Sequence, residues 1–97
     1  MNKYYFKKIG RIFKPNNKNW SQSHCMLPSI LKLNKSKLRI YYGTRDKKNI
    51  SSIGYFDLNP STLKVSNRAY IPCFSKGELG TFDDNGVLPS CLLKEGK

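Results

Sequence analysis

The chain has 97 residues, of which 38% are hydrophobic and 12% aromatic, and its formal net charge at pH 7 is +12. This length allows one domain with a modest core, and the aromatic content favours a β-rich fold. No apolar run approaches the roughly 18 residues of a membrane-spanning helix. These properties exclude a multidomain protein and a helical membrane protein, and we expect no membrane partner.

The charge comes from 18 Lys and Arg against 6 Asp and Glu, a balance that suggests nucleic acid or an anionic surface as a partner. Most of the basic residues fall in the first 48 positions, but they stand singly or in pairs and never form a run. This scattered placement disfavours nucleic acid. A small basic binding module for nucleic acid or anionic glycan stays open as the alternative function.

Three cysteines, Cys25, Cys73 and Cys91, and the sole histidine, His24, have no metal-ligand spacing. We therefore expect no metal centre and no cofactor. The N-terminus is basic but lacks the apolar core of a signal peptide, and an odd cysteine count without such a leader is typical of reduced thiols. We expect a cytoplasmic protein.

Residues 1–18 form a basic lead-in with several aromatic side chains, which Pro15 and the Asn16–Asn17 pair terminate. We expect this segment to dock its aromatic side chains on the unit that follows. An arm that binds nucleic acid or a membrane is the alternative.

Short β-patterns separated by polar turns come next. Pro28 imposes an extended conformation on Leu27 and predicts that a strand begins there. The four strands are expected at residues 27–33, 38–44, 50–58 and 63–66, with an extension of the last one to Tyr70 left open. Polar turns at residues 34–37, 45–49 and 59–62 join them into an antiparallel meander.

The stretch around the first strand recurs near the C-terminus. SQSHCMLPSILKL, residues 21–33, and TFDDNGVLPSCLLK, residues 81–94, share a Leu-Pro-Ser and an apolar run at an offset of 61 without a gap. A four-stranded meander followed by a repeat of its first strand is typical of a β-propeller blade. We expect an all-β fold with one four-stranded antiparallel blade at residues 19–80. The second Leu-Pro-Ser would enter the inner strand of another blade, starting at residues 81–97.

The segments WSQSHCMLPSILKL, LRIYYGTRDKKNISSIGYFDL and GTFDDNGVLPSCLL, in this order and spacing, resemble the first part of five-bladed β-propellers of the glycoside-hydrolase type. The nearest groups are arabinanase/xylosidase-like and mannoside-phosphorylase-like proteins. The resemblance implies a fragment of a protein that binds carbohydrate and cleaves a glycosidic bond by hydrolysis or phosphorolysis. A five-bladed ring needs about 300 residues at this spacing, so the remaining blades would come from another chain, or from self-association through open sheet edges.

The resemblance also implies where a sugar would bind, because these families place their pocket at the axial mouth, where the inner strands begin. The offset of 61 aligns Ser23 and His24 with Asp84 and Asn85, so all four would face the axis. His24 and Asn85 are therefore candidate substrate-binding residues, although a lone histidine beside a strand is often a packed residue.

Two further positions are candidates for sugar binding. The turn at Arg45 and Asp46 joins the second and third strands and would lie at the same mouth, and its alternative role is a solvated turn or a local ion pair. Trp20 would offer an aromatic face to a pyranose ring, and its alternative role is packing under the first blade.

Asp83 and Asp84 are the candidate catalytic residues, because glycoside cleavage uses two carboxyl groups that flank the scissile bond. Neighbours on a strand point to opposite faces, so one would act on the substrate while the other caps the turn. Asp-Asp-Asn-Gly is also a ready turn sequence. Many members of the resembling families carry an Asp-Pro where this chain has Leu27-Pro28, so a first carboxylate is missing. We expect the chain alone to lack glycosidase activity.

Overall fold

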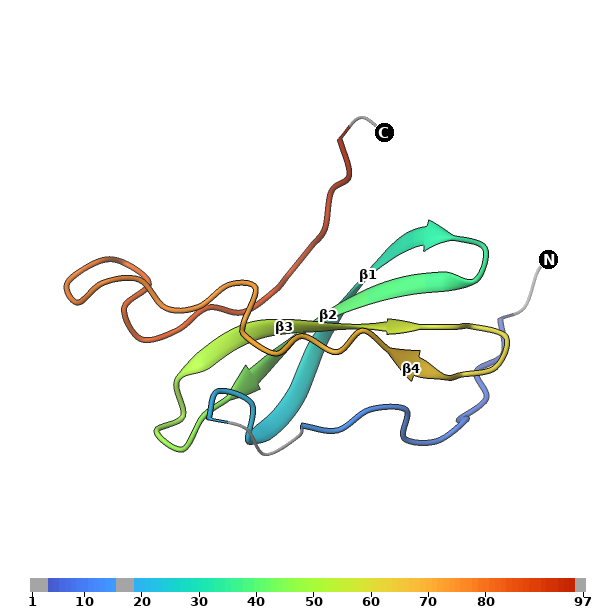
Figure 1. Ribbon diagram of the computed structural model, residues 1–97, viewed down its shortest axis with the longest axis horizontal. Coiled ribbons are helices and arrows are strands. Elements are labelled where there is room, and N and C mark those ends of the chain that lie inside the picture. The colour runs from blue at the N-terminus through green and yellow to red at the C-terminus, as the bar shows by residue number, and fades with distance from the viewer. Residues whose placement is uncertain (1–3, 16–18, 96–97) are drawn as a thin grey trace.

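The computed structural model describes residues 4–15 and 19–95 and contains one four-stranded antiparallel sheet with the strand order β1-β2-β3-β4 (Figure 1). The strands are β1 (Ser23–Asn34), β2 (Lys37–Arg45), β3 (Ser51–Leu58) and β4 (Val65–Ser66). Each strand pairs with its neighbour in sequence, so the sheet is an open meander. The expected all-β fold with four antiparallel strands is confirmed. The described residues include no helix, and so none that is long and apolar enough to cross a membrane.

β2 and β3 form the regular centre of the sheet. They pair without interruption from Leu38 opposite Leu58 to Arg45 opposite Ser51. Both strands lie within one residue of the ranges expected from the sequence. The alternating apolar side chains specify this register, because a slip by one residue would turn every core side chain to the opposite face.

β1 is longer and less regular than the sequence indicates. It begins at Ser23, and the extended conformation expected for Leu27 is wrong, since its φ is 52°. The register shifts between Ser23 and Met26 and again between Met26 and Ser29, which marks β-bulges on either side of Met26. Bulges in an edge strand tolerate Pro28, which has no N–H for the ladder. The strand therefore runs past the proline instead of beginning at it.

β4 is confined to Val65–Ser66, shorter than the expected range and without an extension to Tyr70. Leu63 and Asn67, on its two sides, have φ angles of 62° and 49°. Both angles fall in the left-handed region, so the backbone departs from extended geometry just before and just after β4.

One face of the sheet, the core face, carries the buried hydrophobic cluster of Ile40, Tyr42, Phe56 and Leu58. Ile40 lies opposite Phe56 in the ladder, and the ring centroids of Tyr42 and Phe56 lie 5.9 Å apart. The cluster comes entirely from β2 and β3, the two strands with the clearest sequence pattern.

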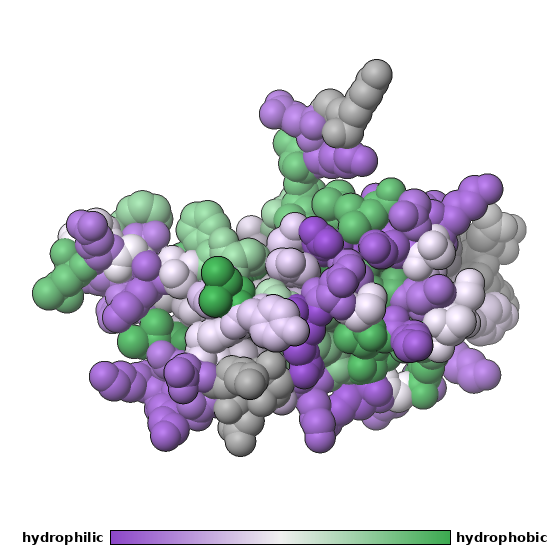
Figure 2. Space-filling view, viewed as in Figure 1, coloured by the Kyte–Doolittle hydropathy of each residue, from purple (hydrophilic) through white to green (hydrophobic). Residues whose placement is uncertain are grey.

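The segment after β4 returns along the same edge of β3. Phe74 forms an antiparallel bridge to Ile53, and Gly86 forms a parallel bridge to Ser51. Between these bridges, residues 75–85 form a lobe that projects at the left of Figure 1. Figure 2 shows hydrophobic side chains on this lobe.

The inner strand expected at the second Leu-Pro-Ser is not formed. Residues 87–95 contain no strand, and Val87 contributes one backbone hydrogen bond, to the carbonyl of Ser51 at 3.1 Å. Leu88 and Pro89 instead pack over Gly43, where an added Cβ would lie 2.7 Å from Leu88 Cδ2. Pro89 cannot donate to a ladder, so side-chain packing on β2 holds this segment.

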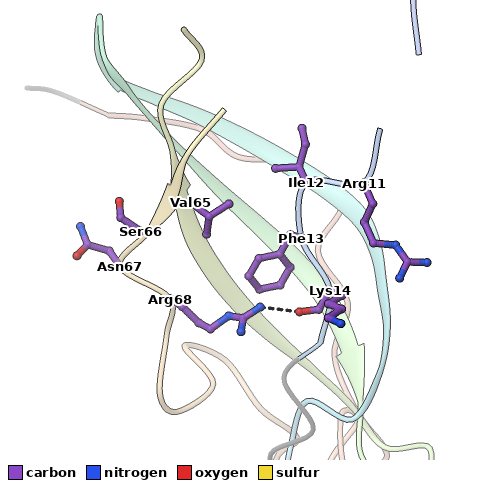
Figure 3. Close-up of a pocket in the computed structure, with 8 residues that line it drawn as sticks. All are labelled: Arg11, Ile12, Phe13, Lys14, Val65, Ser66, Asn67 and Arg68. Carbon is purple, nitrogen blue, oxygen red and sulfur yellow. Dashed lines mark hydrogen bonds between the residues drawn. The ribbon is translucent and has the colours of Figure 1, made fainter. Parts of the chain in front are cut away.

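Residues 11–15, the strap, cross the core face and complete it. The Phe13 ring stacks on Phe56 with ring centroids 4.0 Å apart and planes 8° apart. The guanidinium group of Arg68 lies 4.1 Å from the Phe13 ring centroid and donates a hydrogen bond to the backbone carbonyl of Lys14 (Figure 3). A stacked ring and a cation–π contact thus fasten the strap to the sheet.

The lead-in therefore docks on the sheet through Phe13. Its other aromatic residues in the described range, Tyr4, Tyr5 and Phe6, are 85%, 85% and 98% exposed. The expected break at Asn16–Asn17 lies outside the described residues.

Candidate functional site

The strand register brings several polar segments into one row across the sheet. Ser23 of β1 lies opposite Arg45 of β2, Arg45 lies opposite Ser51 of β3, and Ser51 bridges to Gly86. At about 4.8 Å between neighbouring strands, the row spans about 14 Å. We call this end of the sheet the β2–β3 end, because the turn between β2 and β3 lies there. Four candidate sugar-binding residues lie in the row or next to a member of it: His24, Arg45, Asp46 and Asn85.

His24 lies exposed near the start of β1, with a φ of 66°. Its Nδ1 is 2.8 Å from the Ser23 hydroxyl. Below it, the buried Thr44 hydroxyl donates to the Ser23 carbonyl at 3.0 Å, and Thr44 Oγ1 lies 3.1 Å from Ser21 Oγ. These bonds hold the backbone of β1 and leave the imidazole at the surface, where it is open to a ligand.

The carboxylate of Asp46 shapes the turn between β2 and β3. Its Oδ1 accepts hydrogen bonds from the backbone N–H groups of Lys48 at 2.8 Å and Ile50 at 3.0 Å. Among the described residues, Arg45 forms no salt bridge with Asp46, and Arg45 Nε is a buried donor without a partner. The ion pair expected as the alternative for this turn is absent, and Arg45 keeps an unsatisfied hydrogen-bonding group at the β2–β3 end.

Asp83 and Asp84 lie in a turn, so the strand geometry expected for them is wrong. Asp84 Oδ2 accepts the backbone N–H of Gly80 at 2.9 Å, and Asp83 Oδ1 accepts the Thr81 hydroxyl at 3.0 Å. Each carboxylate therefore stabilises its own loop. The turn ends at Gly86, with a φ of 139°, where a Cβ would approach the backbone of β3 too closely for any other residue.

Trp20 packs on the core face. A Cβ on Gly54 would lie 2.7 Å from the Trp20 ring, and the indole Nε1 donates to the carbonyl of Tyr70 at 2.9 Å. The Trp20 ring therefore packs on the sheet, and its hydrogen bond holds the segment after β4. Packing is the alternative role that the sequence left open for this residue.

Asp57 is the buried carboxylate of the sheet, and it lies away from the β2–β3 end. It accepts hydrogen bonds from Arg39 Nε at 2.8 Å and Nη2 at 3.1 Å, and from Asn67 Nδ2 at 2.9 Å. The Arg39 bonds hold the pKa of Asp57 below its ordinary value, against the opposing effect of burial. A carboxylate so fully paired is structural, and the sequence carried no signal that this aspartate faces an arginine.

Two open hollows lie among the described residues. The larger, about 630 Å³, lies between the strap and β4. Figure 3 shows Phe13, Val65 and Arg68 directed toward one another across it, whereas Arg11 and Asn67 point away. The larger hollow is therefore lined by side chains that attach the strap to the sheet. None of the candidate residues lines it.

The smaller hollow, about 300 Å³, lies at the β2–β3 end, at the lower limit of the range for small-molecule sites. Asp46 lines it as a candidate residue. No sequence pattern singled out the other polar residues of its lining, Asn19, Gln22, Lys47, Lys48 and Lys76. They come from separate segments with no shared motif, so their meeting could be seen only in the fold.

Among the described residues, no group of three or more His, Cys, Asp or Glu side chains could hold a metal ion. The chemistry of the β2–β3 end is that of hydrogen-bonding and basic side chains.

Comparison with known proteins finds similar chains in Mycobacterium tuberculosis. The uncharacterized protein MT1551 of strain CDC 1551 / Oshkosh and the uncharacterized protein Rv1502 of strain H37Rv are each 34% identical to this chain over 93 residues. The matched region covers 94% of this chain and 31% of each relative, so the chain spans about a third of the length of the curated relatives it matches. No protein-family model and no solved structure matches the chain.

Proposed function

We propose that the chain is one blade of a carbohydrate-binding β-propeller of the glycoside-hydrolase type, and that its β2–β3 end faces the sugar. The observation that carries this proposal is the row from Ser23 through Arg45 and Ser51 to Gly86. It gathers an imidazole, a guanidinium group, a carboxylate and an amide where the first strand begins. Such groups can donate to and accept from the hydroxyl groups of a sugar.

The length of the mycobacterial relatives supports the same architecture. Since 93 residues make up 31% of each relative, each is about 300 residues long, enough for about five units at the 61-residue spacing of the repeat. The resembling propellers have five blades. Further blades are needed to close a ring around this one.

In this proposal the chain alone binds a sugar but does not cleave it. Asp83 and Asp84 are bonded into their own loop, and the proline of the first repeat follows Leu27 in place of an aspartate. Cleavage with retention or inversion needs two carboxyl groups held about 5 to 9.5 Å apart across the scissile bond. A complete pair would require a carboxylate from another blade.

Titration of the ¹⁵N-labelled chain with arabinotriose, xylotriose and mannobiose tests the proposal by NMR. We expect at least one sugar to shift the amide signals of His24, Arg45 and Asn85, while those of the distant β1–β2 turn at Lys35 stay in place. Aryl glycosides should release no phenol. Failure of every sugar to shift these signals would remove the proposal, and turnover abolished by Asp84→Ala would remove its non-catalytic part.

A basic binding module that takes nucleic acid or anionic glycan over its whole surface is the second candidate. It is favoured by the net charge of +12 and by the lysines around the smaller hollow. This candidate predicts binding to single-stranded or duplex DNA that weakens steeply as salt is added, because each neutralised phosphate releases counterions. An affinity for DNA that does not change with salt, or no binding, would eliminate it.

A further inference from the structure

The smaller hollow at the β2–β3 end has a strongly positive lining. Lys47 and Lys48 come from the turn between β2 and β3, and Lys76 comes from the segment after β4. Three positive charges from two separate segments therefore surround a space of about 300 Å³. Clefts lined by one sign of charge attract ligands of the opposite sign.

The lysines of this hollow outnumber its carboxylates. Asp46 is the one acidic residue among the described residues that line it, and its Oδ1 accepts hydrogen bonds from two backbone N–H groups of its own turn. Asp83 and Asp84, in the neighbouring lobe, are hydrogen-bonded to Thr81 and Gly80. None of the three lysines forms a salt bridge within the described part of the chain, so their charges are free for a ligand.

The same hollow also offers neutral hydrogen-bonding groups. The amide side chains of Asn19 and Gln22 line it, and the backbone N–H of Gln22 donates to the carbonyl of Arg45 at 2.9 Å, which fixes this segment to the end of β2. Amides bind hydroxyl groups, whereas ammonium groups bind oxyanions. The lining thus combines the two kinds of recognition that a charged sugar requires.

We propose that the saccharide bound at the β2–β3 end carries an acidic group, a carboxylate or a phosphate ester, which Lys47, Lys48 and Lys76 recognise while Asn19 and Gln22 bind its hydroxyl groups. This inference rests on the function proposed above and narrows its substrate class to acidic saccharides. It differs from a basic surface that binds any polyanion, because the three lysines act at one place.

Binding constants for four probes test the inference on the intact chain. They are a trisaccharide of glucuronic acid, the neutral glucose trisaccharide of the same linkage, glucose 6-phosphate and inorganic phosphate, each titrated by NMR at low salt. We expect one of the acidic sugars to bind about tenfold more tightly than the neutral trisaccharide, the sum of three exposed ion pairs. The better of the two acidic probes identifies carboxylate or phosphate ester as the natural group.

Two matched triple variants test whether the lysines of this hollow cause the tighter binding of the acidic sugar. The triple variant Lys47→Gln, Lys48→Gln, Lys76→Gln should lose about tenfold in affinity for the acidic sugar and keep its affinity for the neutral one. The control Lys32→Gln, Lys35→Gln, Lys64→Gln removes the same charge from exposed positions away from this hollow, and it should bind as the parent does. Retained dispersion of the NMR spectrum shows that each variant is folded.

Each other outcome decides against the inference in a distinct way. Equal affinity for acidic and neutral sugars at the β2–β3 end would overturn it and leave the proposed function standing. Equal losses in the two triple variants would show attraction by total charge, and tighter binding of inorganic phosphate than of either acidic sugar would show a simple anion site. Absence of binding by all sugars would remove both proposals.

Discussion

The Asp57 side chain is 1% exposed, and its two oxygen atoms are shared by Arg39 and Asn67. Arg39 also lies over the ring of Tyr55, 4.5 Å from its centroid. A buried charge is tolerated only with such partners, since an uncompensated one is costly. The pKa of Asp57 is lowered chiefly by the Arg39 hydrogen bonds. This carboxylate therefore stabilises the fold when ionised, and that contribution is lost when it is protonated.

The sign of the pH effect follows from linkage. Because the folded pKa lies below the ordinary value of about 3.9, this stabilisation is complete above that value and falls as the pH decreases through the folded pKa. In Arg39→Met the partner is gone, and burial raises the pKa of Asp57 instead. We expect Arg39→Met to lose about 3 to 5 kcal/mol of unfolding free energy at neutral pH. The loss should shrink on acidification, because protonation removes the unpaired charge.

Urea denaturation of the parent and Arg39→Met across the acidic range measures this gap. Arg39→Lys keeps the positive charge but loses the bidentate contact with Asp57. Its unfolding free energy should therefore lie between those of the parent and Arg39→Met. A gap that stays constant from neutral to acidic pH would show that the pairing of Asp57 contributes little.

At the scale of the elements, the strap has a structural role that its loop conformation does not reveal. The sheet would otherwise expose the core face, and Phe13 covers it by stacking on Phe56 and lying 5.0 Å from the Tyr42 centroid. The edge strands are less regular: β1 is bulged and β4 is short. Bulged and short edges resist unwanted pairing with other sheets.

Phe13→Ala should destabilise the fold by about 2 to 3 kcal/mol, somewhat less than a fully buried phenylalanine would, because its ring is half-buried. Thermal and urea unfolding measure the change. Phe6→Ala is the matched control: its side chain is 98% exposed, so we expect a change within about 0.5 kcal/mol. Equal effects of the two substitutions would mean that the strap does not hold the core face.

The whole molecule combines a net charge of +12 with apolar side chains at the surface of its lobe. Leu79 and Phe82 are 97% and 101% exposed there. Charge repulsion keeps such chains apart at low salt, whereas an exposed apolar patch favours contact with another surface. The balance between them sets the association state.

Raising the salt from about 20 mM to about 500 mM should therefore increase self-association, since it screens the repulsion and leaves the apolar contact intact. Light scattering after size-exclusion chromatography gives the mass at each salt concentration. The double variant Leu79→Ser, Phe82→Ser should reduce this salt-induced self-association. Leu63→Ser should not reduce it, because Leu63 lies outside the lobe. A monomer at both salt concentrations and at high protein concentration would argue against self-association of this chain.

Much of the sheet can be predicted from local patterns in the sequence. The ranges of β2 and β3, the meander order and the tight turn ending at Gly86 follow from alternation and turn chemistry, which act between near neighbours in the chain. Antiparallel pairing of the strands also places His24, Arg45 and Asp46 at one end of the sheet, whereas Asn85 reaches this end through the parallel bridge between Gly86 and Ser51.

The sequence by itself determined the all-β meander, the ranges of its two central strands and the basic character of the surface. Only the tertiary structure decided that β1 runs through Pro28, that Phe13 closes the core and that Asp57 meets Arg39. It alone brought Lys76 to the lysines of the β2–β3 turn. These features depend on contacts between segments far apart in the chain, whose free energies a local pattern does not contain.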